Sequence, residues 1–222
     1  MIAARFRHRA WEAEVAIERH AHVLSQLRAI SWLWKRAPLD ARILTSGESV
    51  VCNLTPFLRD GVTGAVTYAA RFPGWLQDAA MHDDVLTFQL EESAIRYDEF
   101  CPHVFSQLVA AFDPYRAAVV HDLELDLDDY EQIVELAQQT GMDVYGRDSV
   151  FRIQPVNFFD GELCRRAFQL EADQVVARLQ GHVAHAALVN DGALIVVTNE
   201  WVERARLKEI HDRVAGLLGR EG

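Results

Sequence analysis

Residues 182–202 read HVAHAALVNDGALIVVTNEWV, and this stretch gives the clearest structural signal in the chain. Two apolar runs, 183–189 and 193–198, flank the tripeptide Asn-Asp-Gly at 190–192. Because Asp-Gly is a dipeptide that type I′ turns favour, the stretch predicts a β-hairpin. A helix over about 200–218 is expected directly after the hairpin, since the apolar residues there recur at helical spacing.

Working outward from the hairpin, the apolar periodicity predicts short strands alternating with longer helices. The expected strands are 2–6, 50–54, 63–72, 85–90 and 116–120. The expected helices are 11–34, 102–112, about 126–141, 161–168 and 171–179. These elements predict an α+β fold with a mixed, largely antiparallel sheet flanked by helices.

The order of the elements is similar in the two halves of the chain, each running strand, helix, two strands, helix. No linker rich in Pro, Ser or Gly separates the halves, and Asp113-Pro114-Tyr115 is too short to serve as one. We therefore expect one α+β domain over residues 1–222, or two subdomains, 1–113 and 114–222, that share an interface.

The composition is that of an ordinary globular protein, since 50% of the 222 residues are hydrophobic and 25% are charged. It excludes a disordered chain, a coiled-coil rod and a disulfide scaffold. The three cysteines are widely spaced, which favours reduced thiols. Acids at Glu12 and Glu14 stand where a signal peptide needs an apolar core, and no apolar stretch approaches the roughly 20 residues of a membrane span. We therefore expect a cytoplasmic protein that does not enter membranes.

The charge is unevenly distributed along the chain. The formal charge is -11, and residues 1–71, 72–146 and 147–222 contribute +4, -14 and -1. The middle third holds sixteen acidic against two basic side chains, most densely between Asp122 and Glu131. Such a region is either a solvated face that aids solubility or a docking surface for a basic partner. Nucleic acid is not an expected partner, because phosphate contacts need clustered Lys and Arg.

No motif in the chain indicates catalysis or cofactor binding. There is no nucleophile elbow, phosphate-binding loop or dinucleotide fingerprint. The acidic run alternates like a calcium loop, but Leu127 stands where an EF-hand needs Gly and Ile133 where it needs Glu. The alternation of acids with leucines instead predicts an extended segment leading into a helix. We expect no metal, no cofactor and no enzymatic activity.

Two parts of the sequence resemble a known family. The opening IAARFRHRAWEAEVAIERHAHVLSQLRAISWLW, residues 2–34, resembles the start of the bacterial polymorphic-toxin immunity proteins called immunity protein 52. VNFFDGELCRRAF, residues 156–168, followed by the hairpin stretch, is similar to the close of several such families. The resemblance implies a non-catalytic antidote in the cytoplasm of a toxin-producing bacterium, which binds and blocks a cognate effector delivered by a secretion system. Related families are often paired with nuclease toxins.

The charge distribution agrees with this implication, because an acidic surface is attracted to the Arg and Lys side chains that a nuclease presents to phosphates. The residues predicted to bind the partner comprise an acidic run and two aromatic anchors. They are Asp122, Glu124, Asp126, Asp128, Asp129, Trp75 and Tyr97. Phe72 and Tyr115 are further candidate anchors.

Two other classes of function stay open. An adaptor or assembly subunit of a secretion apparatus would use the same fold and the same acidic face. A small enzyme would have to build its site from scattered groups such as His82, Asp83, Asp84, His103 and His121. Self-association also stays open.

Overall fold

The computed structural model describes residues 1–10, 15–36, 44–46, 49–69, 82–121 and 123–219, with the backbone alone at 44–46, 49 and 123–128. The strands in this part of the chain are β1 Ile2–His8, β2 Leu44–Ser46, β3 Ser49–Asn53, β4 Val62–Ala69, β5 Asp84–Leu90, β6 Arg116–Val120, β7 Val156–Phe159, β8 His185–Val189 and β9 Gly192–Val196. The helices are α1 Ala16–Arg28, α2 Tyr97–Glu99, α3 Phe105–Phe112, α4 Leu123–Thr140, α5 Gly161–Phe168, α6 Ala172–Leu179 and α7 Arg204–Leu217.

The nine strands described form one sheet in the order β2-β3-β4-β5-β1-β6-β7-β9-β8. This confirms the α+β class, but every pairing is antiparallel, so the mixed sheet that we expected is in fact antiparallel. The first strand, β1, lies near the centre and joins β5 of the first half to β6 of the second.

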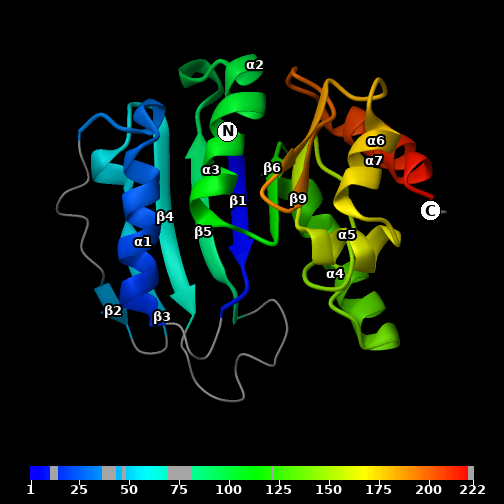
Figure 1. Ribbon diagram of the computed structural model, residues 1–222, viewed down its shortest axis with the longest axis horizontal. Coiled ribbons are helices and arrows are strands. Elements are labelled where there is room, and N and C mark those ends of the chain that lie inside the picture. Colours follow the sequence, from blue (N-terminus) through cyan, green and yellow to red (C-terminus); the bar gives the residue numbers. More distant parts are fainter. Residues whose placement is uncertain (11–14, 37–43, 47–48, 70–81, 122, 220–222) are drawn as a thin grey trace.

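The two halves do not repeat one topology. In the first half, β1 pairs with β5, the last strand of that half, whereas in the second half β6 pairs with β7, the next strand along the chain. Helices also cover the sheet differently, since α1 and α3 lie in front of β4, β5 and β1 while α5, α6 and α7 pack at the other end (Figure 1). The similar order of elements therefore does not amount to a repeated fold.

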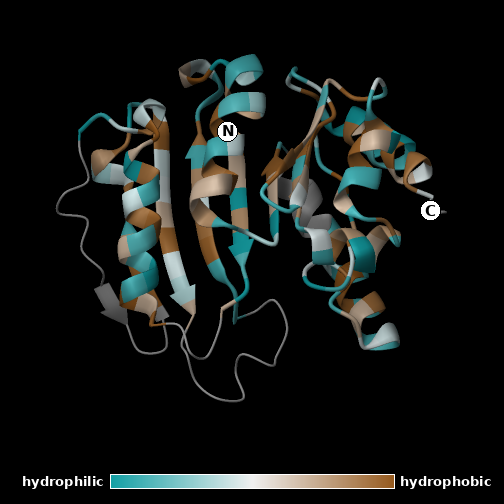
Figure 2. Cartoon of the chain, viewed as in Figure 1, coloured by the Kyte–Doolittle hydropathy of each residue, from teal (hydrophilic) through white to brown (hydrophobic). Residues whose placement is uncertain are grey.

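Alternation along the strands separates two hydrophobic cores. Phe6 of β1, Phe88 of β5 and Phe158 of β7 point into the core beneath α1 and α3. Phe159 of β7 and Ile195 of β9, on the opposite face, belong to the core beneath α5, α6 and α7. Figure 2 shows hydrophobic residues along the strands that α1 and α3 cover. A period of two in the strands thus lets one sheet serve both cores.

Several predicted elements differ in extent from the observed ones. The helix expected over 11–34 is α1, followed by a short 3₁₀ turn at Ser31–Leu33. The helix expected from Pro102 begins earlier, as α2 at Tyr97–Glu99, and a π-helical turn at Phe100–Val104 connects α2 to α3. Strand β7 was not predicted, because four residues are too few for a periodic signal.

The hairpin is confirmed, but its turn lies one residue earlier than expected. Val189 pairs with Gly192, so the turn residues are Asn190 and Asp191. Of these two, only Asn190 has a positive φ, 51°, so the turn is not of type I′. Gly192 begins β9, and a Cβ atom there would lie 2.4 Å from the Phe158 ring and 2.5 Å from the Phe159 carbonyl oxygen. This glycine is needed for close packing against β7.

Candidate partner-binding surface

The acidic run belongs to a helix. Glu124, Asp126 and Asp128 lie in the first turns of α4, and the extended conformation that we expected for the run is therefore wrong. A helix suits acids in its first turns, because their charge opposes the positive end of the helix dipole. Asp122 and Trp75 lie outside the described residues, and the side chains at 123–128 are likewise not described.

Asp129 attaches α4 to the rest of the molecule. Its Oδ1 atom accepts a hydrogen bond of 2.6 Å from Nη2 of Arg152, and its Oδ2 atom bonds Nε of the same guanidinium. The side chains of Asp129 and Arg152 are 6% and 14% exposed, so water screens the pair little. This placement corrects our assignment of Asp129 to the docking surface, since a buried and paired carboxylate does not face a partner.

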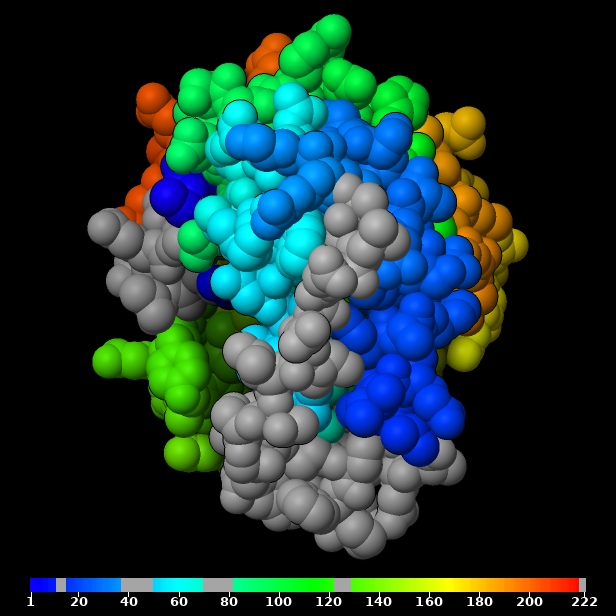
Figure 3. Space-filling model, turned by 90° about the vertical axis from the view of Figure 1, so that its left-hand side faces the viewer, coloured from blue at the N-terminus to red at the C-terminus, as the bar shows by residue number. Residues whose placement is uncertain are grey.

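From Tyr130 onward, α4 exposes both acidic and apolar side chains. Tyr130 is 63% exposed and Leu136 39% exposed, and Glu131 and Glu135 are exposed as well. Among the side chains described, none from α4 belongs to either hydrophobic core. The atoms of this part of the chain, green in Figure 3, project from the side of the molecule. We call the four residues named here the α4 surface.

An aromatic cluster of Tyr97, His121 and Trp201 lies next to the start of α4, because His121 comes two residues before it. The Oη atom of Tyr97 lies 2.5 Å from Nε2 of His121, and the His121 ring stacks on Trp201. The backbone N–H of Val202 donates to Nδ1 of His121 over 3.4 Å, which assigns the proton to Nε2, so His121 donates to Tyr97. Burial lowers the pKa of His121 to about 4, and the ring is therefore neutral at physiological pH.

Exposed acids flank this cluster in the sequence. Asp98 and Glu99 follow Tyr97 directly, and Glu200 precedes Trp201. Tyr97 itself is half-buried, bonds His121 and packs against the core beneath α1 and α3. Reasoning from the sequence missed His121 and Trp201 as members of one group, because 80 residues separate them.

A polar cluster around Asp83 fixes the loop after α4 against the sheet. Nε and Nη2 of Arg147 donate to Oδ1 of Asp83 over 3.1 and 2.6 Å, and the hydroxyl of Tyr115 donates to Oδ2 over 2.6 Å. Nε of Arg7 lies 3.4 Å from the same Oδ2 atom. Burial raises the pKa of Asp83, while these cations oppose the shift. Tyr115, a candidate anchor, is thus buried inside the fold, and Phe72, the other further candidate, lies outside the described residues.

Three of the scattered groups considered for an enzyme are held by different partners. Asp83 is enclosed by arginines, His121 by aromatic rings, and Asp84 lies 3.4 Å from Nε of Arg19. Burial raises the pKa of Cys101 and that of Cys164 to about 12, so neither thiol is ionised at neutral pH. In the part of the chain that the structure describes, no three His, Cys, Asp or Glu side chains group as metal ligands.

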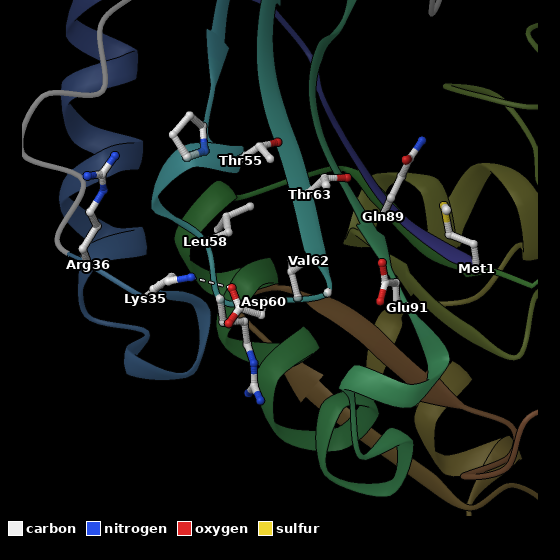
Figure 4. A pocket seen from close by; sticks show the side chains of 13 residues that line it. Met1, Lys35, Arg36, Thr55, Leu58, Asp60, Val62, Thr63, Gln89 and Glu91 are labelled. Atoms are coloured by element: carbon white, nitrogen blue, oxygen red, sulfur yellow. Dashed lines mark hydrogen bonds and ion pairs between the residues drawn. The ribbon is translucent and has the colours of Figure 1, made fainter.

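The structure also contains an open pocket of about 420 Å³ near the starts of β1 and β4 and the end of β5 (Figure 4). Lys35 and Asp60 form an ion pair at its rim, with 2.6 Å between Nζ and Oδ1. This contact lowers the pKa of Asp60 and keeps its carboxyl group ionised. Among the described residues that line the pocket there is neither histidine nor cysteine.

Comparisons with known proteins support the fold. No protein-family model matches the chain, and no curated protein matches it in sequence. Among solved structures, the Pseudomonas aeruginosa T6SS (type VI secretion system) protein PA0821 is similar, with a TM-score of 0.52 and 11% identity over 98% of this chain and 72% of that chain. At this identity the likeness shows a common fold. The resemblance to immunity protein 52 gains no support from a family model.

None of the helices in the described ranges combines the length and the apolar character that crossing a membrane requires.

Proposed function

We propose that this chain is an immunity protein that binds and neutralises a bacterial effector toxin, and that the α4 surface is its main contact. The observation that carries the proposal is an acidic helix whose exposed residues include Tyr130 and Leu136 and which contributes no described side chain to either core. Tight complexes need apolar anchors surrounded by polar groups, and the α4 surface offers both.

The charge of this region favours a toxin with a basic surface. Glu131 and Glu135 continue the acidic run of α4, and the middle third of the chain carries a charge of -14. Opposite charges accelerate association and disfavour wrong partners. A nuclease fits this description, because its substrate site presents cations to phosphate groups.

A non-catalytic role agrees with the state of the titratable groups. The buried thiols at Cys101 and Cys164 stay protonated, and His121 is neutral and enclosed by aromatic rings. Asp83 is held by Arg7, Arg147 and Tyr115. A catalytic base or nucleophile would need access to a substrate as well as a suitable pKa.

The similar solved structure is named as a T6SS protein, which suits an antidote against a secreted effector and also an adaptor of the secretion apparatus. The two functions differ in whether the protein protects the cell from a toxin. An antidote protects the cell from one toxin, whereas an adaptor is needed for secretion and gives no such protection.

The deciding experiment is co-expression with any toxin domain that a gene neighbouring this one encodes. We expect growth to be rescued, and the two proteins to co-purify and to melt at a higher temperature than either alone, because a ligand of the native state stabilises it. The variant Tyr130→Ala/Leu136→Ala should lose rescue, while Val15→Ala/Ile17→Ala, which alters exposed apolar residues near α1, should keep it. Absence of both rescue and co-purification with the wild-type protein would refute the proposal.

A further inference from the structure

Strand β8 lies at the end of the sheet. Within the described strands it pairs with β9 and with no other. In a hairpin with two turn residues, the closing pair exchanges both hydrogen bonds, and every second pair does the same along the strands. His185, Ala187 and Val189 therefore bond to β9. The N–H and C=O groups of Ala186 and Leu188 consequently point toward the open edge.

β8 lacks three of the features that prevent edge strands from pairing with other chains. Natural sheets protect their edges with charged side chains, proline or bulges. β8 contains no Asp, Glu, Lys, Arg or Pro, and it pairs with β9 residue for residue without a bulge. Leu188 is 54% exposed. The neighbouring β9 is buried along its whole length, so β8 is paired with a strand of the hydrophobic core.

The composition of β8 favours a second copy of this chain as the partner. The chain carries a formal charge of -11, so two copies repel each other across most of their surfaces. The β8 edge has no acidic side chain and permits close approach. A two-fold axis places a strand antiparallel to its own copy, so the outward donors of one copy meet the outward acceptors of the other.

We propose that the protein dimerises through β8, forming one continuous antiparallel sheet across a two-fold axis. With Ala187 on the axis, Ala186 of one copy lies opposite Leu188 of the other, and these are the residues whose backbone groups point outward. Their side chains lie on one face of the sheet, so each Leu188 gains an apolar neighbour. This inference does not depend on the proposed antidote function.

The first test is the mass of the protein in solution, measured by light scattering from low to high micromolar concentration. We expect the mass to rise from that of one chain to that of two. Ala186→Pro removes an outward donor without breaking the ladder to β9, and Leu188→Lys adds a charge at the interface. Each should weaken dimerisation at least about tenfold, while Ile17→Lys, an exposed apolar residue on α1, should have no effect.

The second test is hydrogen exchange of single amides. We expect the amides of Ala186 and Leu188 to exchange more slowly as concentration rises, and that of Ala187 to stay protected throughout. Wild-type protein that keeps the mass of one chain at all concentrations overturns the proposal. A dimer in which the amides of Ala186 and Leu188 remain unprotected overturns it as well, because the interface then lies elsewhere.

Discussion

The imidazole ring of His121 stacks on the indole ring of Trp201, with the ring centroids 4.5 Å apart and the planes 5° apart. This contact joins the end of β6 to the segment before α7, and Tyr97 adds α2 through its hydrogen bond to His121. Three segments distant in sequence thus meet next to the start of α4. We expect this contact to govern the response of the fold to acid.

The first prediction concerns pH. The pKa of His121 lies at about 4, below its ordinary value of 6.5, so between these values the unfolded chain binds a proton that the native protein does not. The native protein is therefore most stable, as far as His121 is concerned, above about pH 6.5, and it loses stability as the pH falls toward 4. We expect the free energy of unfolding to drop by roughly 2 kcal/mol from about pH 7 to about pH 5 through this residue. Urea unfolding should show a smaller drop for His121→Asn, and equal drops would contradict the assignment.

The second prediction concerns the attachment of α4. Asp129→Asn leaves the guanidinium of Arg152 buried without its carboxylate, and we expect a loss of about 2–4 kcal/mol in the free energy of unfolding. Asp98→Asn breaks the exposed pair with Arg96 and should change stability little, because water screens that pair. Chemical denaturation measures both variants. Similar small effects at the two positions would mean that Asp129 does not anchor α4.

The third prediction compares two glycines. Gly192→Ala places a Cβ atom against the Phe158 ring and the Phe159 carbonyl, and should destabilise the protein by about 1–3 kcal/mol or more. Gly216 lies within α7 with no atom within 4 Å of an added Cβ, so Gly216→Ala should stabilise the protein by up to about 1 kcal/mol. Thermal unfolding of both variants gives the signs. A Gly192→Ala variant as stable as the wild type would show that β7 and β9 can separate without cost.

The fourth prediction rests on the proposed function and concerns association with the toxin. Glu131→Lys/Glu135→Lys should slow association at least about tenfold and reduce its dependence on salt. The control, Glu209→Lys/Asp212→Lys, makes the same change in charge at exposed positions in the middle of α7. Reversing the acids in the first turns of α4 is a poorer test, because lysines there would oppose the helix dipole. Binding kinetics at two salt concentrations decide the matter, and equal effects of the two pairs would place the contact elsewhere.

The spacing of apolar residues along the chain was sufficient to predict many of the helices and strands. Alternating apolar runs around a turn predicted the hairpin of β8 and β9, and helical spacing predicted α5, α6 and α7 closely. The acidic run was harder, because acids alternating with leucines over six residues also permit a helix. The apolar residues Leu127, Tyr130, Val134 and Ala137, at helical spacing, were the signal that favoured the helix.

The order of the strands could not be predicted. β1 lies between β5 and β6, and each pairing joins segments that are far apart in the sequence. Local propensity carries no information about such partners, since any half-buried strand has similar composition. For the same reason the enclosure of Asp83 by Arg7 and Arg147 could not be predicted.

The sequence by itself determined the α+β class, the hairpin, the helical periods and the location of the acidic excess, because these depend on neighbouring residues and on composition. Tertiary structure alone decided which acids are available to a partner. Asp129 and Glu131 are two residues apart and both acidic, yet one is buried against Arg152 and the other is exposed. The reason is physical: burial depends on which distant segment packs against each face of a helix, and a carboxylate leaves water only where a cation meets it.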